Sequence, residues 1–455
     1  MKQKLFGTSG VRGVVNVDLT PEKTLQIASA IATYTDSGKI LVGHDTRTSA
    51  SMLEHSLISG LLAGGCSVYR LGLVPTPVLA FLTREFKADA GIMITASHNP
   101  PEYNGIKLFN RDSMAFNEEK QNQIEKIVEN KSFGRADWKN IKKETRIDET
   151  CRYTDAIQKT VTLKKEWRIV LDTANGATSY IAPILFRKLG CKVTAINSQP
   201  DGFFPGRSPE PNPESLQPLC QIVKQLKANA GIAYDGDGDR MVAVDEKGKI
   251  CPLDQILAAY ASHVVKKNKG GTVVTTVETS MCIDEMVKQH HGRVERTKVG
   301  DISVAVAIRD HKAIFGGEPC GAWIHPKYHY CPDGILSSIL LFKALEEQKI
   351  ILSKFVSRVP QYLMLRENLT CPNNIKSEVM DKLEKEADSA FPRIEKKLTI
   401  DGLHITLENG WVLIRASGTE PLIRINAEAK SANEAKEIME KGTKLVKKLV
   451  KEVVK

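Results

Sequence analysis

The feature that most constrains the fold is a pattern of strands and helices that occurs three times in the 455-residue chain. Each copy is expected to run strand, helix, strand, helix, strand. The copies occupy residues 39–100, residues 167–240 and, in a more degenerate form, residues 271–323. Short sequences at the start of the third strand agree between the first two copies, ADAGI and ANAGI. The repeat predicts three similar α/β domains with mixed, largely parallel sheets.

A polar loop follows the third predicted strand of each copy. These loops read TASHNP at 95–100, DGDGDR at 235–240 and GGEPCG at 316–321. In open α/β sheets, ligands bind beyond the carboxyl ends of the strands. Because the three loops hold equivalent places in the repeat, we expect them to face one central cleft.

The C-terminal part of the chain has a different pattern. Residues 410–428, GWVLIRASGTEPLIRINAE, predict two strands around a polar loop, and a helix is expected from Ser431 to the end. This indicates a smaller α+β domain. We expect domains at 1–150, 151–250, 251–360 and 361–455. The proline-rich stretch at 199–215 is interpreted as a loop over the second domain.

Composition excludes several classes of protein. The nine cysteines form no CxxC pair, which argues against a disulfide framework or a zinc site and favours a reducing compartment. No apolar run approaches the roughly 18 residues that span a bilayer, and the first residues lack an apolar signal core. We therefore expect a cytoplasmic protein without a membrane partner.

The formal net charge of +10 raises the question of whether the protein binds nucleic acid. Much of the excess lies in residues 441–455, which predict an amphipathic helix with a solvated lysine face. Only 6% of the residues are aromatic, and no basic cluster is interleaved with them, so no nucleic-acid partner is expected. A positive balance also suits anionic substrates such as sugar phosphates.

The DGDGDR loop places three carboxylates at alternate positions. Asp235, Asp237 and Asp239 would repel one another unless a cation lies among them, and hard oxygen ligands in a compact loop suit Mg²⁺. An EF-hand would explain Glu246 at the twelfth position, but Arg240 occupies the sixth position, where that loop needs glycine. A surface acidic turn without metal remains an alternative.

The TASHNP loop contains Ser97, which allows two interpretations. A lone serine most often caps the following turn, and the GxSxG pattern of a hydrolase nucleophile is absent. However, Ser97 adjoins His98, lies near Lys107, and holds the place that the repeat makes equivalent to Asp235. A serine hydroxyl near a metal could be phosphorylated and pass the group on.

Two further loops contain candidate binding residues. Glu318 could accept hydrogen bonds from sugar hydroxyls, or it could be a solvated loop residue. In RASGTEP, at 415–421, small residues leave backbone N–H groups available to an anion, and Arg415 and Arg424 flank them. Arginines on exposed strands are often merely solvated, so this loop alone does not decide.

Six motifs taken together resemble the α-D-phosphohexomutases. They are FGTSGVRG (6–13), TASHNP (95–100), YNGIK (103–107), DGDGDR (235–240), GGEPCG (316–321) and RASGTEP (415–421). The resemblance covers nearly the whole chain and implies three similar α/β domains and a smaller fourth domain around a central cleft. It also implies interconversion of hexose 6-phosphate and hexose 1-phosphate through a phosphoserine and a bound 1,6-bisphosphate. The first motif is more similar to the phosphoglucosamine mutases, with the phosphomannomutase/phosphoglucomutases as the alternative. A non-catalytic sugar-phosphate sensor is a remote alternative.

The resemblance also implies a role for individual residues. One Mg²⁺ per chain would be held by Asp235, Asp237, Asp239 and the phosphate on Ser97, with hexose 1,6-bisphosphate as activator. The other catalytic residues would be Arg12, His98, Lys107 and Arg240. The residues that bind the hexose or hexosamine phosphate would be Lys298, Glu318, Cys320, Arg415, Ser417, Gly418, Thr419 and Arg424. Cys320 stands where the family usually has serine, which leaves the sugar preference open. A homodimer is compatible with these observations.

Overall fold

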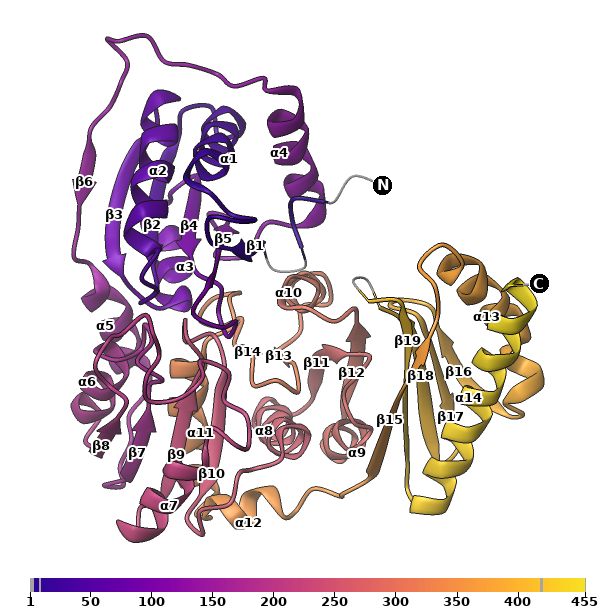
Figure 1. Cartoon of the computed structure of the whole chain (residues 1–455). Helices are drawn as coiled ribbons and strands as arrows, with labels where there is room; N and C mark the ends of the chain where they lie inside the picture. The colour runs from indigo at the N-terminus through magenta and orange to yellow at the C-terminus, as the bar shows by residue number, and fades with distance from the viewer. Residues whose placement is uncertain (1–3, 8–9, 418–419, 455) are drawn as a thin grey trace.

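The computed structural model of the chain describes residues 4–7, 10–417 and 420–454. Four units follow one another, and each is built on its own sheet (Figure 1). The first three are α/β units arranged side by side, and the fourth lies next to the third. No helix in the described ranges is long and apolar enough to cross a membrane.

The first unit is a six-stranded sheet with the order β1-β5-β4-β2-β3-β6. Strands β2, β3, β4 and β6 are parallel, and β1 and β5 add an antiparallel edge. Its elements are β1 (Val11–Val14), α1 (Pro21–Tyr34), β2 (Lys39–His44), α2 (Ala50–Ala63), β3 (Ser67–Leu73), α3 (Thr76–Glu85), β4 (Ala90–Ile94), β5 (Tyr103–Phe109), α4 (Glu118–Asn130) and β6 (Glu144–Arg146). Every residue of β4 is buried, as its continuous apolar sequence predicts.

The second and third units repeat this plan with four strands each, in the orders β10-β9-β7-β8 and β12-β11-β13-β14. The second contains α5 (Thr150–Thr160), β7 (Arg168–Asp172), α6 (Ile181–Lys188), β8 (Lys192–Ile196), α7 (Gln217–Gln225), β9 (Ala230–Tyr234) and β10 (Met241–Asp245). The third contains α8 (Leu253–Asn268), β11 (Gly271–Thr276), α9 (Cys282–Lys288), β12 (Gly292–Thr297), α10 (Asp301–Asp310), β13 (Phe315–Gly317), β14 (Trp323–Ile324), α11 (Gly334–Gln348) and α12 (Leu352–Val356).

The predicted repeat is confirmed by the corresponding strands. In each unit the third strand of the repeat, β4, β9 or β13, is followed by an antiparallel partner, β5, β10 or β14. The three polar loops connect these pairs. Buried apolar side chains of all three units form one continuous cluster, so the units share a core. Shared packing fixes the loops relative to one another.

The fourth unit has a wholly antiparallel sheet with the order β15-β19-β18-β17-β16. Its elements are β15 (Leu363–Thr370), α13 (Lys376–Ala390), β16 (Ile394–Leu398), β17 (Leu403–Leu407), β18 (Gly410–Ala416), β19 (Leu422–Ala429) and α14 (Ala432–Val454). Helices α13 and α14 cover one face and enclose a separate hydrophobic core. The predicted strand pair and terminal helix are β18, β19 and α14. The opposite face looks toward the third unit (Figure 1).

Candidate active site

Ser97 lies at the carboxyl end of β4 and points across to the second unit. Its backbone φ of 53° lies in the left-handed region, which is uncommon for serine and frequent at functional sites. Its Oγ donates to Oδ2 of Asp235 at 2.8 Å and lies 3.2 Å from Nδ1 of His98. The side chain is therefore directed at the acidic loop and not at the turn that follows it.

A buried arginine holds the main chain of this loop in place. The guanidinium of Arg47 donates to the carbonyl oxygens of Ser97, Asn99, Pro100 and Tyr103. Its Nε also pairs with Asp45 at 3.1 Å, and both side chains are fully buried. Because Arg47 is planar and has several fixed donors, it constrains the whole loop at once. Ser97 is consequently presented on a rigid support.

The acidic loop between β9 and β10 brings its three carboxylates together. One oxygen from each of Asp235, Asp237 and Asp239 lies within 4.8 Å of the others. Lys107, on β5, donates to Oδ2 of Asp237 and to Oδ2 of Asp239, both at 2.7 Å. The strands on both sides of the loop exclude the EF-hand, which requires helices there.

The pKa values in this loop reflect burial and the lysine. Burial, followed by repulsion from Asp239 and Asp237, raises the pKa of Asp235 well above its usual value. Burial would also raise the pKa of Asp237, but attraction and hydrogen bonding by Lys107 outweigh it and lower that pKa. Burial would lower the pKa of Lys107, whereas Asp237 and Asp239 raise it. Lys107 is thus an ammonium in this arrangement.

The donor set fits a divalent cation with hard ligands. Oδ1 of Asp237 and Oδ1 of Asp239 are buried and have no hydrogen-bond partner. A buried carboxylate oxygen without a partner is costly, and a cation among these oxygens removes that cost. Mg²⁺ prefers carboxylate oxygens, so the residues present fit the metal that the sequence predicts.

Ser97, Lys107 and Asp239 line a cavity of about 350 Å³, whose walls include residues of the first, second and third units. Its lining includes Arg12, Ser97, Lys107, Asp239, Arg240, Glu318 and Cys320. Burial, and then the positive charges of Arg240 and Arg12, lower the pKa of His98 to about 3, so the ring is neutral near pH 7. The sequence-predicted catalytic residues are therefore adjacent in space.

Glu318 and Cys320 of the third unit are among the residues that line this cavity. Oε2 of Glu318 accepts a hydrogen bond from the Gly300 N–H at 2.9 Å. Burial, and then repulsion from Asp301, raise the pKa of Glu318 to about 7. Burial also raises the pKa of the Cys320 thiol to about 12, which keeps the thiol protonated at neutral pH.

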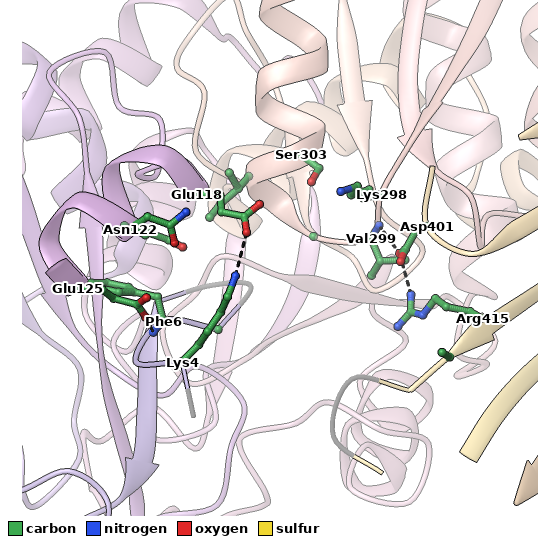
Figure 2. Close-up of a pocket in the computed structure, with 15 residues that line it drawn as sticks. Lys4, Phe6, Glu118, Asn122, Glu125, Lys298, Val299, Ser303, Asp401 and Arg415 are labelled. Atoms are coloured by element: carbon green, nitrogen blue, oxygen red, sulfur yellow. Dashed lines mark hydrogen bonds and ion pairs between the residues drawn. The ribbon is translucent and has the colours of Figure 1, made fainter. Parts of the chain in front are cut away.

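A second cavity, of about 570 Å³, lies between α4, the segment before α10, and β18 (Figure 2). Lys298 and Arg415 line it, and Val299 and Gly300 line both cavities. Nη1 of Arg415 lies 3.0 Å from Oδ2 of Asp401 and 3.1 Å from Oε1 of Glu278, a residue that lines the first cavity. The two cavities therefore adjoin, and Arg415 lies where the third and fourth units meet.

The remaining predicted phosphate-binding residues do not all lie at the two cavities. Ser417 is buried, and its Oγ accepts from the Glu420 N–H at 3.1 Å. Arg424 donates to Oε2 of Glu420 at 2.6 Å and lines neither cavity. The positions of Gly418 and Thr419 lie outside the described residues.

Several residues of the site were not found from the sequence. Thr76 donates to Oδ2 of Asp237 at 2.5 Å from the start of α3. The buried ammonium of Lys376, at the start of α13, donates to the Ser417 carbonyl at 2.7 Å and to the Glu420 carbonyl. The partners of Lys376 are main-chain atoms, which leave no signal in a sequence.

Models of one protein family match all four units of the chain. Family models described as phosphoglucomutase/phosphomannomutase, alpha/beta/alpha domains I, II and III, match residues 3–135, 151–248 and 252–362. The model of the C-terminal domain of the same family matches residues 368–444. The matched ranges contain all six motifs described above.

Individual relatives agree over their full length. The chain is 44% identical to a probable phosphoglucosamine mutase of Pyrococcus abyssi, covering 98% of this chain and 99% of the relative. It is 43% identical to a phosphoglucosamine mutase of Methanococcus maripaludis, covering 98% of each. A crystal structure of a phosphoglucomutase/phosphomannomutase family protein from Burkholderia thailandensis superposes with a TM-score of 0.89 at 28% identity, covering 99% of this chain and 98% of that one. The chain belongs to the phosphoglucomutase/phosphomannomutase family, the α-D-phosphohexomutases.

Proposed function

We propose that this chain is a phosphoglucosamine mutase, which interconverts glucosamine 6-phosphate and glucosamine 1-phosphate through a phosphorylated Ser97 and a bound 1,6-bisphosphate. The observation that carries the proposal is the contact of Ser97 with Asp235 and the convergence of Lys107 and Glu318 on the same cavity. Similarity to phosphoglucosamine mutases over nearly the whole chain supports the amino-sugar substrate.

In the first half of the reaction, the bond between phosphorus and Ser97 Oγ breaks while a bond to a sugar hydroxyl forms. The hydroxyl loses its proton, and Ser97 Oγ takes one up. Lys107, which lines the cavity with Ser97, would act on the proton of the attacking sugar hydroxyl. Arg12 and Arg240 line the same cavity and offset negative charge on the transferred group.

The acidic loop would add to this electrostatic stabilisation by holding a metal ion. Asp235, Asp237 and Asp239, together with the phosphate on Ser97, would hold Mg²⁺. When bound, the ion supplies positive charge that lowers the cost of charge on the phosphoryl oxygens. A hexose 1,6-bisphosphate would act as activator, because it can phosphorylate Ser97 if the group has been lost.

The second half of the reaction requires the bisphosphate to turn round and return its other phosphate to Ser97. The phosphate that is not reacting needs a separate site. Lys298 and Arg415, in the adjoining cavity, would bind it, and Glu318 would accept hydrogen bonds from the sugar hydroxyls. Binding energy at that remote phosphate orients the reacting end of the sugar.

A substrate panel tests the proposal. Mutase turnover is measured with the 1- or 6-phosphates of glucosamine, glucose and mannose, in the presence of Mg²⁺ and a trace of hexose bisphosphate. Preference for glucosamine phosphate, lost in Ser97→Ala, is the expected result. Equal or faster turnover of glucose and mannose phosphates would make the chain a phosphomannomutase/phosphoglucomutase. Binding without turnover would make it a sugar-phosphate sensor.

A further inference from the structure

The proline-rich loop at 199–215 crosses the seam between the first and second units. A Cβ added at Gly202 would lie 2.4 Å from the Thr48 nitrogen and 2.5 Å from the Thr46 carbonyl oxygen, so the two backbones are in close contact there. The guanidinium of Arg47 also lies 5.3 Å from the centre of the Phe204 ring. Since Arg47 holds the Ser97 loop, the loop at 199–215 and the Ser97 loop share one support.

Farther along, the same loop contacts the acidic loop that contains Asp235 and Asp237. A Cβ added at Gly236 would lie 3.3 Å from Cβ of Pro209 and 2.5 Å from the carbonyl oxygen of Ser97. The next residue after Pro209 is Glu210, which belongs to none of the six family motifs. The packing of Pro209 therefore holds the main chain next to Glu210 against the acidic loop.

The carboxylate of Glu210 lies between two groups that surround Ser97. Its Oε2 is 3.7 Å from Nε2 of His98 and 3.8 Å from Nη1 of Arg240. This oxygen is buried and accepts no hydrogen bond, although the Glu210 side chain as a whole is 40% exposed. An inward movement of less than about 1 Å would bring Nη1 of Arg240 within hydrogen-bond distance, and Nε2 of His98 as well in the ring tautomer that carries its proton there. A buried acceptor beside the Arg240 guanidinium favours such a movement, because an unsatisfied acceptor is costly.

Both neighbours of Glu210, His98 and Arg240, also lie close to Ser97 or to the cavity that contains it. Nδ1 of His98 lies 3.2 Å from Ser97 Oγ, and Arg240 lines the cavity that contains Ser97. His98 belongs to the first unit and Arg240 to the second. A carboxylate that holds both consequently constrains their orientation relative to Ser97 and to each other.

We infer that Glu210 is a positioning residue for phosphoryl transfer, holding the imidazole of His98 and the guanidinium of Arg240 in place around Ser97. The inference rests on the proposed mutase function. Phosphoryl transfer depends mostly on the position of charged groups around the transferred group. Loss of the Glu210 charge therefore slows the chemical step without weakening the grip on the remote phosphate, which lies in the adjoining cavity.

Three variants test this role. Glu210→Gln keeps the shape and removes the charge, Glu210→Asp keeps the charge with a shorter reach, and Glu214→Gln changes an exposed residue of the same loop. We expect kcat of Glu210→Gln to fall by about tenfold with KM within about twofold of the wild type. Glu210→Asp should retain more of kcat than Glu210→Gln, and Glu214→Gln should match the wild type.

Several results would overturn the inference. They are a kcat of Glu210→Gln within twofold of the wild type, a loss confined to KM, or a Glu210→Asp variant no better than Glu210→Gln. Wild-type turnover on the substrate panel is measured first, with Ser97→Ala as the blank. An inactive wild type contradicts the proposed function, whereas an active wild type with an unchanged Glu210→Gln contradicts only the role of Glu210.

Discussion

Oγ of Ser97 lies 2.8 Å from Oδ2 of Asp235, although the two residues are 138 positions apart in the chain. They occupy equivalent loops of the first and second repeats, each between a buried strand and its antiparallel partner. Neither unit alone contains both groups. The reaction centre therefore depends on the shared core that packs the first two units together. Equivalent loops of the repeat contribute different groups to it, a serine hydroxyl from the first unit and a carboxylate from the second.

Replacing Ser97 tests the covalent relay. Ser97→Ala removes the hydroxyl that donates to Asp235 from the TASHNP loop. We expect mutase turnover to fall by a factor on the order of 10³ or more, since no phosphoenzyme can form. Intact-mass analysis should find a phosphoryl group on the wild type after incubation with hexose bisphosphate and none on the variant. Ser51→Ala, at an exposed position of α2, serves as the control; full turnover by Ser97→Ala would contradict the relay.

Replacing Asp237 tests the metal site. Asp237→Asn keeps the size of the side chain but removes a charge from the three-carboxylate cluster, whose oxygens lie within 4.8 Å of one another. We expect the Mg²⁺ concentration for half-maximal turnover to rise by more than about tenfold. Calorimetric titration of metal-stripped protein with Mg²⁺ measures the loss of affinity directly. Asp155→Asn, at an exposed position of α5, should leave both quantities unchanged. Equal Mg²⁺ affinity in Asp237→Asn and the wild type would refute the assignment.

The sequence predicted some residues of this site and missed others, and the difference lies in what each residue contacts. The repeat predicted the fold, and the equivalence of Ser97 with Asp235 predicted that their loops meet. Glu210 and Lys376 were not singled out. Glu210 depends on how the loop at 199–215 packs across the seam, and Lys376 depends on main-chain carbonyls. Local patterns predict strands and loops, whereas contacts between distant elements depend on packing that no motif encodes.

Replacing Lys376 tests the support of the loop at 415–421. Its ammonium donates to the carbonyls of Ser417 and Glu420. Lys376→Met leaves these acceptors without their donor, at a cost of about 1–3 kcal/mol. We expect KM for the sugar phosphate to rise roughly tenfold and kcat to change less, since the loop is remote from Ser97. Lys382→Met, on a more exposed part of α13, is the matched control. A fall in kcat with KM unchanged would remove this loop from substrate binding.

Replacing Glu318 tests the burial that raises its pKa from 4.5 to about 7. Because the folded-state pKa is the higher one, the folded protein holds the Glu318 proton over a pH range in which the unfolded chain has released it. This contribution to stability is therefore lost as the pH rises from about 4.5 to about 7. Glutamine does not titrate, so Glu318→Gln is spared that loss, which is worth up to about 3 kcal/mol.

The comparison is made by thermal unfolding at about pH 5 and about pH 8. We expect the melting temperature of Glu318→Gln relative to the wild type to be higher at the upper pH than at the lower one. Glu214→Gln, at an exposed position, should follow the wild type at both. A difference between Glu318→Gln and the wild type that stays constant with pH would mean that Glu318 titrates normally. In that case Glu318 would face water instead of lying buried in the wall of the cavity that it shares with Ser97, and its role in holding the sugar would lose its physical basis.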